Sequence, residues 1–370
     1  MPTRRRFAFL VAISGIGALT AVHCGGQPSS NLSSSSGDTT SSGNTGSGGT
    51  SSGNTNTSSG TNVTSSGGSG TITSSGGEEP PPPPKRIERA QNLPTRSAGC
   101  GKASPTNGAR VTLASGRQYM SYHGDNYSPE GLGERGYPVM VALHGCYADV
   151  GYFATDFMNF QRAGAVGNEG IVVYGIANNP QSSCGWQVGS DDELDYLDSV
   201  IAKVAEQYCI DESRVLMLGY SWGSYQAHHY ACSRPGKIKA VIGGAGGYPN
   251  TYNTDPRVCG QIPTLIYGRT HDNDEYISKS YNARDKKLET NECQNNPSAA
   301  AAPFANNPNP NVVGCVDYPG CVDGLRMTFC EDPEQLFDKV KYGQGSEPGW
   351  NHTIWHHYHR SLWQWFTGLP

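Results

Sequence analysis

Apart from three arginines near its start, the 370-residue sequence has no stripe or patch of basic residues. It carries 27 lysines and arginines against 32 acidic residues, which gives a formal net charge of -5. Proteins that bind nucleic acid generally concentrate positive charge on one face, because phosphate contacts supply much of their affinity. The charge balance therefore argues against nucleic acid as a partner.

Hydrophobic runs long enough to cross a bilayer comfortably are also missing. The longest apolar stretch, residues 7–22, is short for a membrane span and follows the three arginines. A basic segment before a short apolar one is typical of an export signal. Residues 21–25, AVHCG, then resemble the lipobox of bacterial lipoproteins, in which Cys24 becomes lipidated. We expect an exported protein, extracellular or held at the surface of the bacterial outer membrane by a lipid anchor on Cys24.

Apolar residues are almost absent between residues 25 and 77, where Ser, Thr, Gly and Asn dominate and the unit TSSG recurs. Five prolines follow at residues 80–84. Such a segment cannot bury a core and is typical of a flexible tether with a short stiff end. We expect a signal peptide at 1–24, a disordered linker at 25–96 and one globular domain at 97–370.

Cysteine pairs of the Cys-x-x-Cys type, which structural zinc sites use, do not occur. The chain has 11 cysteines, and a lipidated Cys24 leaves ten, all between Cys100 and Cys330. An even set in an exported protein indicates disulfides, with a pairing that the sequence leaves open. We expect up to five disulfides and no bound metal.

Beyond residue 97, short apolar runs alternate with segments of helical periodicity. The runs that we expect to be buried strands are residues 139–143, 171–174, 215–218, 240–242, 264–267 and 326–329. Between them, Ser190 and Glu193 have the spacing of a capping box at the start of a helix. Strands that alternate with helices in this way predict an α/β fold, with a mostly parallel central sheet covered by helices on both faces.

Ser221 lies in the motif GYSWG, residues 219–223, between an expected strand and an expected helix. In α/β-hydrolases the nucleophilic serine occupies such a turn, and the flanking glycines let backbone segments approach closely. The motif alone carries little weight, because Gly-x-Ser-x-Gly also occurs in the linker at residues 49–53, without a strand or helix beside it. The flanking pattern therefore predicts an α/β-hydrolase with Ser221 as its nucleophile.

A second strand, residues 139–143, leads into His144, Gly145 and Cys146. Such folds place a backbone NH at this turn, where it helps to hold the negative charge of a tetrahedral intermediate. We expect the oxyanion-hole donors to be the backbone NH groups of Cys146 and Trp222. The glycine bend is the functional requirement, so we predict a structural part for the His144 side chain.

The base that activates the serine has to come from ten histidines. α/β-Hydrolases run in the order serine, acid, histidine along the chain, which excludes every histidine before Ser221. Two more, His228 and His229, fall in the helix directly after the serine. The histidines that remain are His271, His352, His356, His357 and His359.

Several short motifs of the C-terminal domain occur in the same order as in a known family. They are residues 97–101 (SAGCG), 143–146 (LHGC), 190–192 (SDD), 214–215 (RV), 283–285 (ARD), 291–293 (NEC), 315–321 (CVDYPGC), 329–330 (FC), 351–354 (NHTI) and 362–366 (LWQWF). On these matches the domain resembles secreted esterases grouped with polyhydroxybutyrate depolymerases and feruloyl esterases, in carbohydrate esterase family one. The resemblance implies hydrolysis of carboxylic esters by a Ser-His-Asp triad without a cofactor.

The same resemblance assigns the remaining triad residues. His352 stands before a terminal aromatic helix, as the catalytic histidine of the family does. The family's acid follows the strand that here covers residues 264–267, and this position matches Asp272, with Asp274 as the alternative. Either carboxylate would orient His352 and stabilise the imidazolium that forms during acyl transfer.

The resemblance implies a feruloyl or acetyl ester on plant polysaccharide as the substrate, with a polyhydroxyalkanoate or another small ester as the alternative. Trp186, Trp350 and Trp355 are candidate substrate-binding residues, and we expect the chain to act as a monomer.

Two other classes of protein stay open. His352, His356 and their neighbours have a spacing compatible with metal ligation, but no carboxylate or cysteine close in sequence completes a ligand set. A non-catalytic surface module that binds polysaccharide is the second. The presence of all three triad residue types in the expected order argues against it.

Overall fold

A computed structural model of the chain describes residues 93–146, 151, 153–161, 164–178, 184–249, 259–272, 275, 277–304, 314–333, 352, 354 and 356–370. The chain divides into two units, Met1–Gly77 and Glu78–Pro370, and every described residue belongs to the second. The predicted signal peptide, Cys24 and the linker as far as residue 92 lie outside the described residues, as do Asp274, Trp350 and Trp355.

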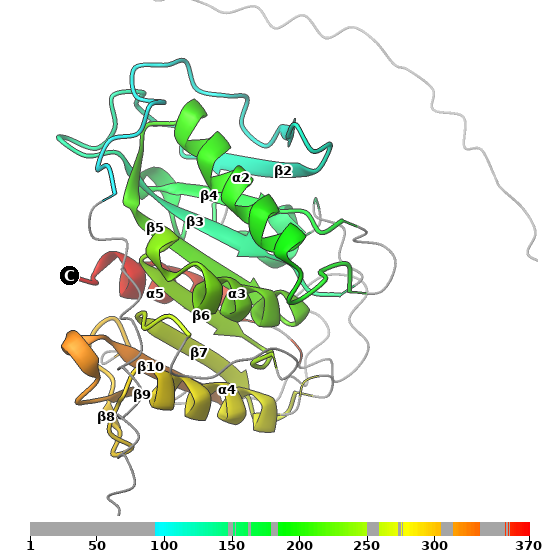
Figure 1. Ribbon diagram of the computed structural model, residues 1–370. Helices are drawn as coiled ribbons and strands as arrows, with labels where there is room; N and C mark the ends of the chain where they lie inside the picture. The colour runs from blue at the N-terminus through cyan, green and yellow to red at the C-terminus, as the bar shows by residue number, and fades with distance from the viewer. Residues whose placement is uncertain are drawn as a thin grey trace, which may run out of the picture. The chain divides into compact units, whose positions relative to one another are not determined.

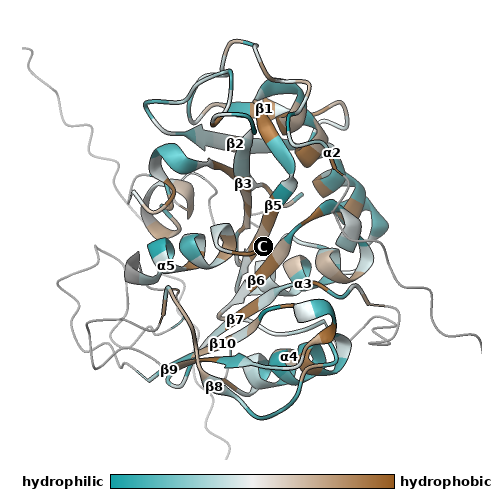
Figure 2. Ribbon diagram, turned by 90° about the vertical axis from the view of Figure 1, so that its left-hand side faces the viewer, coloured by the Kyte–Doolittle hydropathy of each residue, from teal (hydrophilic) through white to brown (hydrophobic). Residues whose placement is uncertain are grey.

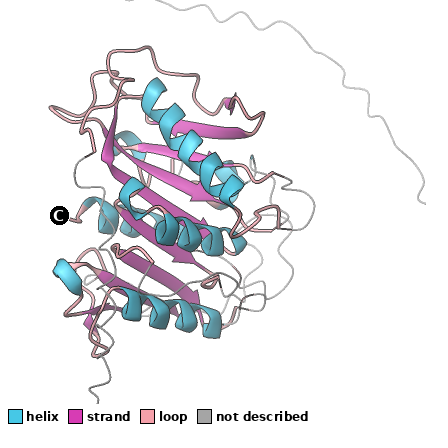
Figure 3. Ribbon diagram, viewed as in Figure 1, coloured by secondary structure: helices cyan, strands magenta, loops and turns pink. Residues whose placement is uncertain are grey.

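A single mostly parallel sheet runs through the described part of the chain (Figures 1 and 3). Its strands are β1 (Arg110–Thr112), β2 (Gln118–His123), β3 (Tyr137–Leu143), β4 (Ile171–Gly175), β5 (Ile210–Tyr220), β6 (Ala240–Gly244), β7 (Thr264–Arg269), β8 (Ser298–Ala299), β9 (Gly314–Tyr318) and β10 (Met327–Asp332). They lie in the order β1-β2-β4-β3-β5-β6-β7-β10-β9-β8. The six neighbours from β4 to β10 are parallel, and the outer strands at both ends pair antiparallel.

The helices cover both faces of this sheet, as predicted. They are α2 (Asp191–Gln207), α3 (Trp222–Ser233), α4 (Ile277–Thr290) and α5 (His356–Thr367), with short helical turns at Phe153–Phe157, Gly167–Glu169, Pro235–Lys237 and Val322–Gly324. Figure 2 shows α5 on one side of the sheet and α2, α3 and α4 on the other.

The core follows the two-residue period of the strands. In β3, Val139 and Val141 pack with α2 and α3, whereas Met140 and Ala142 pack on the opposite face with the aromatic side chains of α5. All four side chains are at most 1% exposed. A strand that is covered on both faces buries successive side chains, which is why the runs predicted as strands are mostly hydrophobic throughout.

The first turn of α2 shows the predicted cap. The hydroxyl of Ser190 accepts a hydrogen bond from the backbone NH of Asp192. Asp191, Asp192 and Glu193 occupy this turn, where acidic residues interact favourably with the positive end of the helix dipole. Leu194, Leu197, Val200 and Val204 then face the sheet on one side of the helix.

The ten cysteines of the domain form five disulfides, which confirms the expected number. The pairs are Cys100–Cys209, Cys146–Cys184, Cys232–Cys259, Cys293–Cys321 and Cys315–Cys330. Cys100–Cys209 joins the start of the domain to the segment before β5, across 109 residues. A covalent link of that length removes much conformational freedom from the unfolded chain.

Within the described residues, no helix combines the length and hydrophobicity that a membrane span needs. The same part of the chain holds no group of three or more His, Cys, Asp or Glu side chains arranged to bind a metal ion.

Candidate active site

Ser221 occupies a sharp turn between the central strand β5 and helix α3. Its backbone angles are φ 54° and ψ -124°, which non-glycine residues rarely adopt. The turn is held in place because the NH of Ser221 donates to the carbonyl oxygen of Gly244 at the end of β6, at 2.9 Å. The strained serine at a strand-to-helix turn is the local geometry that the sequence pattern predicted.

The two glycines of the motif are required by close backbone contacts. A Cβ atom on Gly219 would collide with the backbone of Gly223, and one on Gly223 would collide with the carbonyl oxygens of Leu143 and His144. The linker copy of the motif lies outside the described residues. At Ser221, therefore, the glycines allow β5, α3 and the end of β3 to pack closely against one another.

Three side chains from distant parts of the chain form one hydrogen-bonded line. The Nε2 atom of His352 lies 2.7 Å from the Oγ of Ser221, and its Nδ1 atom lies 2.8 Å from Oδ2 of Asp272. All three residues are at most 6% exposed. Ser221 follows β5 and Asp272 follows β7, and the carboxyl ends of these parallel strands meet at the same edge of the sheet.

The chemistry of the Asp272–His352 and His352–Ser221 pairs defines where their protons lie. A carboxylate only accepts hydrogen bonds, so the proton between Asp272 and His352 resides on Nδ1. Nε2 then carries no proton, and the hydroxyl of Ser221 donates to it. Asp272 also accepts a hydrogen bond at Oδ1 from the backbone NH of Glu275, at 2.8 Å, which fixes the carboxylate.

The turn after β3 lies directly beside the serine. A Cβ atom on Gly145 would stand 2.8 Å from the Cβ of Ser221 and 3.2 Å from its Oγ, so only glycine fits there. The peptide group between Gly145 and Cys146 is thereby brought next to Ser221, and Trp222 is the following residue in the chain. The disulfide Cys146–Cys184 ties this turn to the segment before α2.

His144 and Trp186 stabilise the turn after β3 through buried hydrogen bonds. The imidazole of His144 is fully buried and accepts a hydrogen bond from the NH of Ala177 at Nε2, at 3.1 Å. The indole of Trp186 donates to the carbonyl oxygen of His144 at 2.9 Å, and its side chain is 4% exposed. These contacts give Trp186 a structural part in this turn, and its part as a substrate contact stays a proposal.

Sequence reasoning missed Tyr220 and Glu275, which contact this hydrogen-bonded line, and Tyr225, which contacts Glu275. The hydroxyl of Tyr220 donates to the carbonyl oxygen of His352, and the hydroxyl of Tyr225 donates to the carboxylate of Glu275. Burial raises the pKa of the Glu275 carboxyl, and the interaction with Tyr225 opposes that shift. Of these three residues only Tyr220 lies within the GYSWG motif, so only its neighbourhood to Ser221 could have been noticed from the sequence.

Two of the other histidine candidates have described side chains, and neither is hydrogen-bonded to Ser221 in the described part of the chain. His271 is exposed, and His359 is buried with its ring stacked 4.1 Å from that of Phe160. The side chains of His356 and His357 lie outside the described part of the structure. Among the candidate bases whose side chains the structure describes, His352 is the one that lies against Ser221.

The α/β-hydrolase class of fold is defined by two features of this chain. In the sheet, β3 lies between β4 and β5, and Ser221 occupies a strand-turn-helix after β5. No protein-family model matches the chain.

Among curated proteins, the relatives of this chain include feruloyl esterases. The chain is 29% identical over 164 residues to a probable feruloyl esterase C of Aspergillus clavatus, a match that covers 41% of this chain and 54% of that protein. It is 27% identical over 158 residues to feruloyl esterase C of Emericella nidulans, with the same coverage. The chain therefore spans about half the length of the curated relatives it matches. The likeness to polyhydroxybutyrate depolymerases stays a prediction.

Solved structures with a similar chain trace include two esterases. An acetyl xylan esterase from Aspergillus awamori matches with a TM-score of 0.45 and 17% identity, over 60% of this chain and 92% of that one. A thermostable esterase matches with a TM-score of 0.45 and 15% identity, over 70% of this chain and 61% of that one.

Proposed function

We propose that this protein is a serine hydrolase of carboxylic esters, with Ser221 as nucleophile, His352 as general base and acid, and Asp272 as the residue that orients His352. The observation that carries the proposal is the continuous hydrogen-bonded line from Ser221 through His352 to Asp272. The feruloyl esterase relatives support the same reaction class.

In the first half of the reaction His352 takes the proton of the Ser221 hydroxyl at Nε2 while Oγ attacks the ester carbonyl carbon. The new C–O bond gives a tetrahedral oxyanion, and Asp272 stabilises the imidazolium across Nδ1. His352 then returns the proton to the departing alkoxide, and the alcohol leaves. The acyl group is now bound to Ser221.

In the second half water attacks the acyl carbon and gives its proton to His352. Collapse of the second tetrahedral oxyanion breaks the bond to Oγ, the proton passes to Ser221, and the carboxylic acid leaves. The backbone NH groups of Cys146 and Trp222 hold the oxyanion in both halves. The loss of one such donor typically raises the barrier by about 3 kcal/mol.

For the substrate we propose a feruloyl or acetyl ester carried on plant polysaccharide. The names of the curated relatives support the feruloyl group. Trp350 and Trp355 stay proposed substrate contacts on the strength of their positions beside His352 in the sequence. The ordinary chemistry of the triad needs no cofactor.

Covalent labelling with a fluorophosphonate tests the reaction class. We expect one adduct per folded chain, lost in Ser221→Ala and kept in Ser51→Ala, which removes the serine of the linker copy of the motif. Labelling that survives Ser221→Ala contradicts the proposal. Methyl ferulate, acetylated xylan, a short nitrophenyl ester and a polyhydroxybutyrate film, each with Ser221→Ala as the blank, then identify the acyl group and the polymer.

We further propose that the protein is exported and held at a membrane by a lipid on Cys24. The five disulfides support export, because such bonds persist in oxidising compartments. Metabolic labelling with a radioactive fatty acid tests the anchor. We expect label in the wild-type chain and none in Cys24→Ala.

A further inference from the structure

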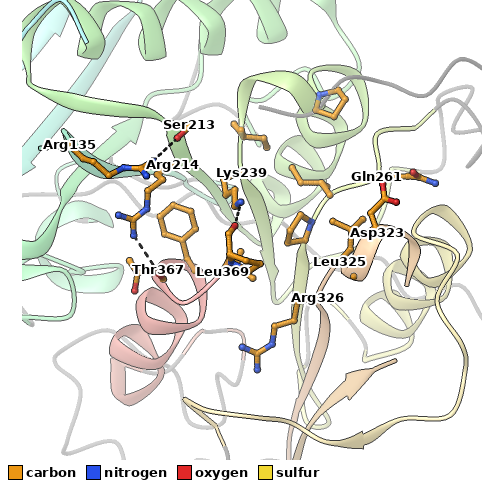
Figure 4. Close-up of a pocket in the computed structure, with 17 residues that line it drawn as sticks. Arg135, Ser213, Arg214, Lys239, Gln261, Asp323, Leu325, Arg326, Thr367 and Leu369 are labelled. Atoms are coloured by element: carbon orange, nitrogen blue, oxygen red, sulfur yellow. Dashed lines mark hydrogen bonds between the residues drawn. The ribbon is translucent and has the colours of Figure 1, made fainter. Parts of the chain in front are cut away.

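A cavity of about 660 Å³ opens at the edge of the sheet away from Ser221 (Figure 4). Its lining includes Arg135, Arg214, Lys239, Arg326, Phe366 and Leu369. Lys239 directly precedes β6 and Arg326 directly precedes β10, whereas Ser221 follows the end of β5. Because these strands run parallel, the cavity and the serine lie at opposite edges of the sheet.

The cavity is rich in positive charge. Its lining has four basic side chains and one acidic one, Asp323. Two of the arginines have carboxylate partners that do not line the cavity. Arg135 pairs with Asp211 at 2.7 Å, and Arg326 pairs with Asp317 at 3.0 Å.

Arg214 differs from these two. In the part of the chain that the structure describes, no carboxylate lies within 4 Å of its guanidinium, and its hydrogen bond is a long one, 3.5 Å, to the carbonyl oxygen of Thr367. Burial lowers the pKa of Arg214, although the group stays charged at any physiological pH. Figure 4 shows this side chain reaching toward the end of α5, beside the cavity.

The contacts with α5 have a structural component. Arg214 donates to the carbonyl oxygen of Thr367, the last residue of α5, just as basic side chains commonly bind the last carbonyl groups of a helix. Lys239 donates to a backbone oxygen of Pro370, beyond the end of the helix. A backbone carbonyl carries only a partial charge, and the Asp211 carboxylate, which attracts Arg214 from a longer distance, is already paired with Arg135, so the Arg214 charge is only partly compensated. An anion bound in the cavity would compensate it.

The remaining walls of the cavity are apolar and favour a ligand with an apolar part. They are formed by Pro235, Ile238, Ile262, Pro263, Leu325, Phe366 and Leu369. A fully hydrated ion such as phosphate gains nothing from such walls, whereas a hydrophobic body buried against them does. The volume falls within the range of cavities that bind small organic ligands.

We propose that this cavity binds an organic carboxylate with an apolar body, whose carboxylate pairs with Arg214 and whose body lies against Ile238, Phe366 and Leu369. The guanidinium presents a planar pair of donors that matches a carboxylate. This binding is independent of the proposed ester hydrolysis, because the cavity does not include the residues around Ser221.

Fluorine NMR titration of the full chain with trifluoromethylbenzoate tests the proposal, with trifluoromethylbenzamide as the neutral analogue. We expect the acid to bind at least about tenfold more tightly than the amide, and Arg214→Met to weaken the acid by a similar factor. Arg214→Lys should retain part of the affinity. Arg110→Met is the matched control, since Arg110 is exposed on β1 and does not line the cavity.

Equal binding of the acid to wild type and Arg214→Met would overturn the proposal, because it would place the ligand elsewhere, the serine site included. Equal binding of acid and amide would overturn it as well. If Arg214→Met does not fold, Thr367→Glu replaces it, since a carboxylate at this lining position competes for the guanidinium and should weaken the acid in the same way. Hydrogen exchange locates the bound acid. We expect the acid to protect backbone amides within residues 235–239 and 366–370.

Discussion

The hydroxyl of Tyr220 donates a 2.6 Å hydrogen bond to the carbonyl oxygen of His352, although 132 residues separate them in the chain. The two rings also lie 5.1 Å apart. Since Tyr220 precedes Ser221 directly, one residue fixes both the strained serine turn and the backbone of its proposed base. The serine and the histidine are therefore positioned by a shared buried contact.

Removal of this hydroxyl in Tyr220→Phe should lower kcat by about five- to tenfold with little change in KM. A buried neutral hydrogen bond contributes roughly 1 kcal/mol, and its loss removes this donor to the carbonyl of His352 and leaves the ring less well oriented. Steady-state kinetics on a soluble ester measures the effect. An unchanged kcat would show that other contacts position His352 by themselves.

Asp272→Asn should lower kcat by roughly a thousandfold or more while the fold is kept. The amide can present an NH to Nδ1 and so favours the wrong tautomer of His352, a change that costs about four orders of magnitude in a serine protease triad. The control is Asp274→Asn, the alternative acid of the sequence analysis. Full activity in Asp272→Asn together with loss in Asp274→Asn would reverse the assignment.

The double substitution Cys146→Ser with Cys184→Ser should reduce activity more strongly than the loss of any other disulfide. This bond ties down the turn that contains the proposed oxyanion donor at Cys146. The matched control is Cys293→Ser with Cys321→Ser. The disulfide that this control removes closes a loop of similar length away from Ser221. Comparable fractional losses of kcat in the two variants would argue against a special part for this turn.

Lys287 provides a prediction about stability. Its side chain is fully buried in α4, with Nζ 4.0 Å from the sulfur of Cys259 and 5.9 Å from the ring centre of Tyr248. The structure shows no carboxylate at ion-pair distance from it among the described residues. Burial lowers the pKa of Lys287 from 10.5 to about 7. The folded protein therefore loses this proton at a lower pH than the unfolded chain does.

Between pH 7 and 10.5 the unfolded chain binds more protons at Lys287 than the folded protein does. The free energy of unfolding of the wild type therefore increases as the pH rises through this range. Lys287→Met removes the penalty and should stabilise the protein at pH 7 by roughly 1–4 kcal/mol. The gain should shrink at pH 9. Urea unfolding at both values measures it, and a Met variant that is less stable at pH 7 would contradict the burial argument.

Much of the fold could be predicted because it depends on local pattern. The apolar runs at 139–143 and 264–267 became β3 and β7, and the capping box at Ser190 starts α2 as expected. The outer antiparallel strands β2 and β9 were not predicted. β2 combines buried and half-buried positions, β9 has an exposed one as well, and both contain polar residues, so neither gives the continuous hydrophobic run of a strand buried on both faces.

Within the site, the flanks of Ser221 were readable because the serine sits at an element boundary with its own local signal, whereas His352 was chosen among five histidines by the resemblance to the esterase family. Sequence reasoning left Asp272 and Asp274 as alternatives, since both follow the same strand. The hydrogen bonds of His352 to Asp272 required the folded chain, as did the burial of Trp186. Local spacing carries no information about which side chains meet across the sheet.

The sequence by itself determined the α/β class, the serine at the strand-to-helix turn, the even set of cysteines and the chain order of the site residues, because periodicity, glycine placement and parity are local properties. Only the tertiary structure decided how the cysteines pair, how Tyr220 joins Ser221 to His352 and where the basic cavity around Arg214 lies. These features arise when strands distant in sequence align, so that side chains with no sequence relation come within hydrogen-bonding distance.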